Sequence, residues 1–149
     1  MQSCYAQMIA HGGVDTDGNL KKLLETICSS PAHMSNPRAY IDAHPVEYRE
    51  LIYYGEHTLR YCFAQFEAGG QTGLTGHIMA SACREILEML DGAPAGDTLL
   101  YTTGQEWYDA CKAHVRELWT RAGDATFQSS YPGLWVLIQV AGADAMSGK

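Results

Sequence analysis

The most regular pattern of apolar and polar positions runs over residues 45–68. Apolar residues recur there every three or four positions, which is the period of a helix with one buried face. Proline is favoured at the first position of a helix, and the pair Gly69-Gly70 is typical of a helix end. The sequence therefore predicts one long central helix, whose core-facing stripe consists of Tyr48, Leu51, Ile52, Gly55, Leu59, Cys62, Phe63 and Phe66.

Other segments have the same helical period, with turn signals at their ends. The polar residues 15–19 predict a turn. Thr103 and Glu106 have the spacing of a capping box, in which a threonine N-cap and a glutamate three residues later satisfy each other's backbone N–H groups. These patterns predict further helices over residues 2–10, 20–29, 75–90 and 104–122.

The last element, residues 134–141, can be read in two ways. Its β-branched and aromatic content suits a strand, whereas the preceding Pro132-Gly133 suits a helix start. We expect an all-α fold, a compact bundle of about five helices around the central helix. It forms a single domain over residues 1–141, followed by a mobile tail at 142–149. The alternative is an α+β fold in which residues 99–102 and 134–140 pair as two short strands.

Composition adds limits on the class of protein. The chain has 149 residues, 46% of them hydrophobic, which is enough to form one core without disulfides or metals. Its net charge is −7, and no run of basic residues is longer than Lys21-Lys22, so it lacks the basic surface of a nucleic-acid-binding protein. An acidic protein of this kind favours encounter with a basic partner.

The same composition indicates a cytoplasmic protein. The N-terminal residues lack the basic and apolar segments of a signal peptide, and no apolar run approaches the ~20 residues of a membrane helix. The five cysteines are odd in number and form no C-x-x-C pair, as is usual in a reducing compartment. Cys62, Cys83 and Cys111 fall on the apolar stripes of their helices, where cysteine acts as a small buried hydrophobe.

The side of the central helix opposite its core stripe has an unusual composition. At about 100° per residue, the residues on that side are Val46, Glu50, Tyr53, Tyr54, His57, Tyr61 and Ala64. Arg49 and Arg60 flank this face. A solvent-facing helix surface normally carries Lys, Glu and Gln at the positions that these tyrosines occupy. Three explanations stay open: packing on both sides of the helix, a protein-binding surface, or a ligand pocket.

In the pocket reading, Glu50 and His57 act as acid, base or orienting groups together with His77. His77 begins the helix that follows the glycine-rich loop at residues 69–76, but this loop matches no phosphate-binding pattern. No pair of histidines or carboxylates has metal-ligand spacing, so neither a metal nor a cofactor is expected.

We therefore expect a small acidic protein that acts by binding another protein. Arg49, Tyr53, Tyr54, His57, Arg60 and Tyr61 are the predicted contact residues. Inhibitors, immunity proteins and anti-defence proteins are the natural classes, with a homodimer through the same tyrosine-rich face as a further option. The alternative is a small helical enzyme or ligand-binding protein that uses the Glu50, His57 and His77 pocket.

Overall fold

The computed structural model describes residues 16–30, 36–92 and 102–142, and all regular structure in these residues is helical. The all-α prediction is confirmed, with eight helices in the described ranges where about five were expected. In chain order they are α2 (Thr16–Ser29), α3 (Pro37–Ala43), α4 (Pro45–Tyr54), α5 (Glu56–Ala68), α6 (Leu74–Asp91), α7 (Gly104–Ala122), α8 (Asp124–Ser130) and α9 (Pro132–Ala141).

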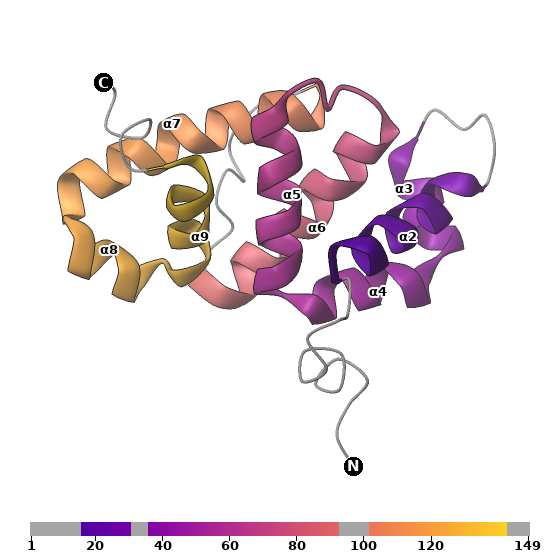
Figure 1. Ribbon diagram of the computed structural model, residues 1–149, viewed down its shortest axis with the longest axis horizontal. Coiled ribbons are helices and arrows are strands. Elements are labelled where there is room, and N and C mark those ends of the chain that lie inside the picture. Colours follow the sequence, from indigo (N-terminus) through magenta and orange to yellow (C-terminus); the bar gives the residue numbers. More distant parts are fainter. Residues whose placement is uncertain (1–15, 31–35, 93–101, 143–149) are drawn as a thin grey trace, which may run out of the picture.

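Helix α5 lies at the centre of the bundle, with other helices on either side of it (Figure 1). Helices α2, α3 and α4 form one side of the molecule, and α7, α8 and α9 form the other. Helix α6 follows α5 after a short connection and packs against it as an antiparallel neighbour. The ring of Phe66 in α5 stacks on that of Tyr108 in α7, with 5.1 Å between centroids, so α7 packs directly on the central helix.

The prediction of one continuous helix over residues 45–68 is wrong. The helix breaks at Gly55, which has φ 56° and ψ −115° and separates α4 from α5. Glycine adopts this conformation because it has no Cβ. Since Gly55 falls on the predicted core stripe, the hydrophobic pattern did not indicate a break there. The hydroxyl of Thr58, in the first turn of α5, donates a 2.6 Å hydrogen bond to the Leu51 carbonyl near the end of α4. This bond satisfies a buried acceptor that the break leaves without a helical partner.

The strand alternative for residues 134–140 is also wrong, because these residues belong to α9. Pro132 occupies the first turn of that helix. The carboxylate of Asp91, at the end of α6, accepts hydrogen bonds from the backbone N–H groups of Gly133 at 2.7 Å and Leu134 at 3.1 Å. The Asp91 side chain therefore satisfies the first N–H groups of α9. The local sequence pattern around residues 132–141 could not indicate this contact, because Asp91 belongs to another helix.

Smaller differences concern the ends of the chain and the short helices. The turn predicted at residues 15–19 is wrong from residue 16 onward, because α2 already begins at Thr16. Helices α3 and α8 were not expected, since seven residues are too few for a clear period. The capping box of Thr103 and Glu106 is confirmed. The predicted helix at 2–10, the strand residues 99–101 and the tail residues 143–149 lie outside the described residues.

The three stripe cysteines lie in the core, as expected. Cys62, Cys83 and Cys111 are fully buried free thiols on α5, α6 and α7. Burial raises the pKa of Cys111 to about 12 and that of Cys83 well above its ordinary value. Thiols in this state are poor nucleophiles, so they serve as packing residues. None of the described helices has the length and apolar character needed to span a membrane.

Candidate functional site: the exposed face of α4

The break at Gly55 divides the predicted contact face between two helices. Arg49, Tyr53 and Tyr54 belong to α4, whereas His57, Arg60 and Tyr61 belong to α5. The two groups have different surroundings, so they must be considered separately.

In the α5 group, His57 and Tyr61 are half-buried, whereas Arg60 is exposed but paired with neighbouring side chains. Burial raises the pKa of the Tyr61 hydroxyl, and Cys62 and two carboxylates of α2, Asp17 and Glu25, raise it further. Arg60 forms an ion pair with Glu56 at 3.1 Å and donates a 2.7 Å hydrogen bond to the side-chain oxygen of Gln139 in α9. Neighbouring helices α2 and α9 therefore contact this part of the face.

On α4, Arg49 and Tyr53 are exposed, whereas Tyr54 is half-buried and packs against the core. Val46 retains 60% of its accessible surface and Tyr53 retains 66%, which is unusual for large apolar or aromatic side chains. With Arg49 and Glu50 they occupy positions i, i+3, i+4 and i+7 of the helix, on one side of it. These four residues, called here the α4 stripe, surround an open hollow of about 240 Å³.

A groove lies along one edge of the α4 stripe, where α3, α4 and α6 meet. Its volume is about 350 Å³, and Arg49 lines both this groove and the hollow of the stripe. Ile41, Pro45 and Ile52 form its apolar wall, with charged groups around them.

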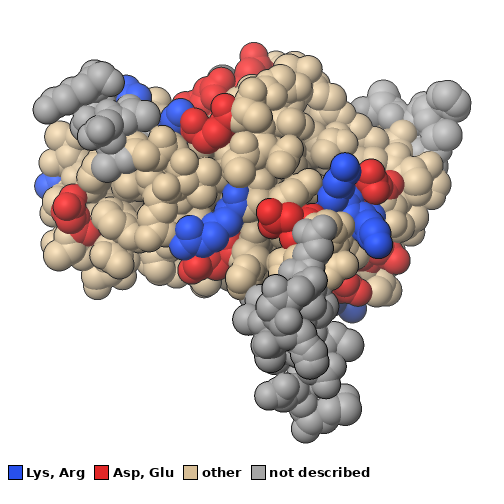
Figure 2. Space-filling view, in the orientation of Figure 1, with Lys and Arg blue, Asp and Glu red and all other residues tan. Residues whose placement is uncertain are grey.

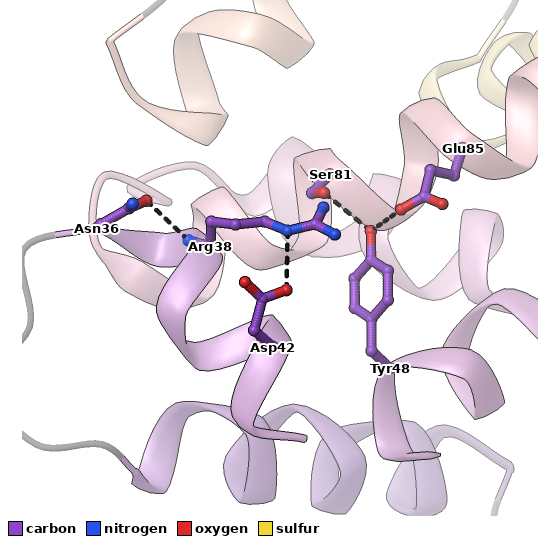
Figure 3. A network of polar contacts seen from close by, with 6 residues as sticks. All are labelled: Asn36, Arg38, Asp42, Tyr48, Ser81 and Glu85. Atoms are coloured by element: carbon purple, nitrogen blue, oxygen red, sulfur yellow. Dashed lines mark hydrogen bonds and ion pairs between the residues drawn. The ribbon is translucent and has the colours of Figure 1, made fainter. Parts of the chain in front are cut away.

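A polar network lies beside this groove, and Arg38, Tyr48 and Glu85 belong to both (Figure 3). Tyr48 reaches from α4 to α6, where its hydroxyl lies 2.8 Å from the Ser81 hydroxyl and donates to the Glu85 carboxylate. Burial and the Glu85 carboxylate raise the pKa of Tyr48, so its hydroxyl stays protonated and acts as a donor. Arg38 of α3 pairs with Asp42 at 3.0 Å, and its guanidinium points towards this network.

A second groove runs along the opposite edge of the stripe, between α2 and α4. It has a volume of about 490 Å³, and Glu50 lines both this groove and the hollow of the stripe. Glu47 and Glu50 give it two carboxylates against the single cation Lys22. Tyr54 also lines it, so this tyrosine faces α2 while Tyr53 faces outward. The α4 stripe is thus a ridge with a groove on each side.

The structure does not bring Glu50, His57 and His77 into one of these three hollows. Glu50 lines two of them, and neither histidine lines any. His57 lies in the first turn of α5. His77 lies in the first turn of α6, which in an antiparallel pair is next to the other end of α5. Among the described residues, no group of three or more His, Cys, Asp or Glu is placed to hold a metal ion.

Acidic and basic side chains are mixed on the face of the molecule shown in Figure 2. Acidic and basic side chains alternate on the half of the surface that contains α2, whereas the surface over α8 and α9 carries few charges (Figure 2). Comparison of the chain with protein-family models, curated proteins and solved structures finds no match in any of the three. The function must therefore be inferred from the surface itself.

Part of this site could not be found from the sequence. Arg38, Ser81 and Glu85 lie on helices other than α4, and Tyr48 belongs to the core stripe of its own helix. Only the packing of α3 and α6 against α4 brings Arg38, Tyr48 and Glu85 to one groove, with Ser81 next to the Tyr48 hydroxyl. The exposed residues of α4, by contrast, were indicated by their angular position around the helix.

Proposed function

We propose that this protein acts by binding another protein through the α4 stripe and the two grooves beside it. The observation that carries the proposal is the exposure of Val46 and Tyr53 on the outer side of α4, next to Arg49. Tyrosine and arginine are enriched among the residues that contribute most to protein interfaces. Grooves on either side of a ridge also give a partner a shaped surface rather than a flat one.

The contacting surface of the partner is expected to be basic. The chain has a net charge of −7, and the groove between α2 and α4 presents the carboxylates of Glu47 and Glu50. Complementary charge increases the rate of encounter and disfavours wrong partners. A small acidic protein with such a face suits an inhibitor, an immunity protein or an anti-defence protein that covers a basic site. The free thiols of the described cysteines support a cytoplasmic location.

The test compares capture of partners from the source cell by the wild-type protein and by a Val46→Ala/Tyr53→Ala variant. Any partner that the wild type enriches is then titrated against both proteins in purified form. Loss of these two anchors is expected to weaken binding at least tenfold, since an interface anchor contributes about 2 kcal/mol or more. Because both side chains are exposed, the free energy of unfolding should change by less than about 1 kcal/mol.

A Met89→Ala/Leu90→Ala variant is the matched control. These two residues are also large and exposed, at 69% and 43%, but they line neither the α4 stripe nor its grooves. The control variant should bind as the wild type does. If instead it loses binding while Val46→Ala/Tyr53→Ala keeps it, the binding face is at the end of α6 and the proposal is wrong.

A further inference from the structure

The α4 stripe is complementary to itself when one copy is turned end to end. In an antiparallel pair of α4 helices centred between residues 49 and 50, Val46 of each copy faces Tyr53 of the other. In the same register, Arg49 of each copy faces Glu50 of the other. Both ends of the contact are then apolar or aromatic. The centre holds two ion pairs, each between Arg49 of one copy and Glu50 of the other.

We propose that the α4 stripe binds the α4 stripe of a second copy of this chain, in a two-fold symmetric antiparallel dimer. A two-fold interface uses the same patch on both subunits, so each favourable contact in it occurs twice. The inference rests on the proposed function in one respect, namely that the α4 stripe is a binding face. It adds that the face is covered by another copy until a different partner displaces it.

Among the described residues, the charges at the centre of the stripe have no competing ion-pair partner. Arg38, Arg60 and Arg121 each pair with a carboxylate one turn away on the same helix. Within the described residues, neither Arg49 nor Glu50 forms an ion pair, and adjacent positions on a helix do not face each other. Both are therefore available to a second copy, and dimer formation breaks no existing pair.

The size of the stripe sets the strength of the dimer. Helix α4 has 10 residues and is about 15 Å long, so one helix pair buries less area than a standard stable interface. The two copies also carry −7 each, and their long-range repulsion opposes association. We therefore expect a dimer in rapid exchange with a dissociation constant weaker than about 1 µM. Salt near 0.15 M screens the repulsion beyond roughly 8 Å and leaves the close pairs less affected.

Charge reversal gives a test that only a self-complementary contact can pass. The variants Arg49→Glu and Glu50→Arg each place like charges opposite one another twice, so each alone should raise the dissociation constant at least tenfold. An equimolar mixture of the two variants restores both opposite-charge pairs and should form a mixed dimer. The doubly reversed variant Arg49→Glu/Glu50→Arg should form a dimer by itself, with a dissociation constant within about threefold of the wild type.

Sedimentation velocity over about 10 µM to 1 mM chain in 0.15 M salt measures the wild type, the two single variants, their mixture and the doubly reversed variant. Arg121→Glu is the matched control, because it changes the net charge as Arg49→Glu does but lies on α7, in a helix-surface pair with Glu117. It should leave the dimer intact. The proposal is overturned if the wild type stays monomeric up to 1 mM, or if mixing the two single variants gives no mixed dimer.

The two proposals can fail separately. If the wild type is monomeric but Val46→Ala/Tyr53→Ala no longer binds the captured partner, self-pairing is wrong and the proposed function holds. If the mixed dimer forms but the partner binds the alanine variant as well as the wild type, the α4 stripe pairs copies of the chain and the partner binds elsewhere.

Discussion

Replacement of Gly55 by alanine tests the break between α4 and α5, on which the exposed stripe depends. Gly55 has φ 56° and ψ −115°, a backbone conformation that residues with a side chain rarely adopt. A Cβ added there meets nothing nearer than the Tyr53 carbonyl oxygen at 3.9 Å, so steric overlap contributes little. The cost is therefore backbone strain, about 1–3 kcal/mol. In a continuous helix the same change would instead stabilise the protein by about 1 kcal/mol.

Urea unfolding followed by far-ultraviolet circular dichroism measures the sign and size of this effect. Thermal unfolding gives a second measure, and a loss of 1–3 kcal/mol in a chain of this length corresponds to a Tm lower by about 2–12 °C. Gly92→Ala is the matched control. Gly92 has φ 81° and ψ −9°, in the ordinary left-handed region, and its Cβ would meet nothing within 4 Å. Its cost should be about 1 kcal/mol, near the lower end of the range for Gly55→Ala.

An unchanged or higher stability of Gly55→Ala would contradict the break at this residue. Such a result would mean that residues 45–68 form one straight helix, as the hydrophobic pattern alone predicts. The exposed stripe on α4 would then lose its structural basis, because its orientation relative to α5 is set by the break.

Two further predictions concern contacts elsewhere in the fold. Thr58→Val removes the only side-chain donor to the buried Leu51 carbonyl among the described residues. It should lower the free energy of unfolding, measured in urea, by about 1–3 kcal/mol. Thr58→Ser keeps the hydroxyl and should therefore keep most of the wild-type stability. Partial burial raises the pKa of Glu67, but hydrogen bonds from Lys112 and Tyr108 outweigh this and hold it below its ordinary value of 4.5. Because the folded-state pKa is lowered, the ionised carboxylate stabilises the fold above pH 4.5, and this contribution is lost as the pH falls through the folded-state value. Glu67→Gln should therefore cost about 1 kcal/mol at pH 7, and its difference from the wild type in urea unfolding should shrink as the pH falls through the folded-state pKa of Glu67; a difference that does not change with pH would contradict this account.

The sequence by itself determined the fold class and most of the helix positions. Helical period, turn signals and the capping box at Thr103 are local properties. The period indicates which side of a helix is buried, and the other two indicate where a helix begins or ends. The same reasoning placed Cys62, Cys83 and Cys111 in the core. It also singled out Tyr53 as an aromatic residue on the wrong side of a helix, because angular position around a helix follows from residue number alone.

The packing of the helices decides which of these residues are exposed and which are covered by a neighbouring helix. Tyr53 and Tyr61 are equivalent in the hydrophobic pattern, yet Tyr61 is half-buried against the core, whereas Tyr53 keeps 66% of its surface exposed. The break at Gly55 could not be predicted, since glycine is compatible with both a helix interior and a positive φ. The choice of helix for α9 depended on Asp91, which lies more than 40 residues away along the chain. Each of these outcomes rests on contacts between segments that are distant in sequence, and a local pattern carries no information about which segment will become its neighbour.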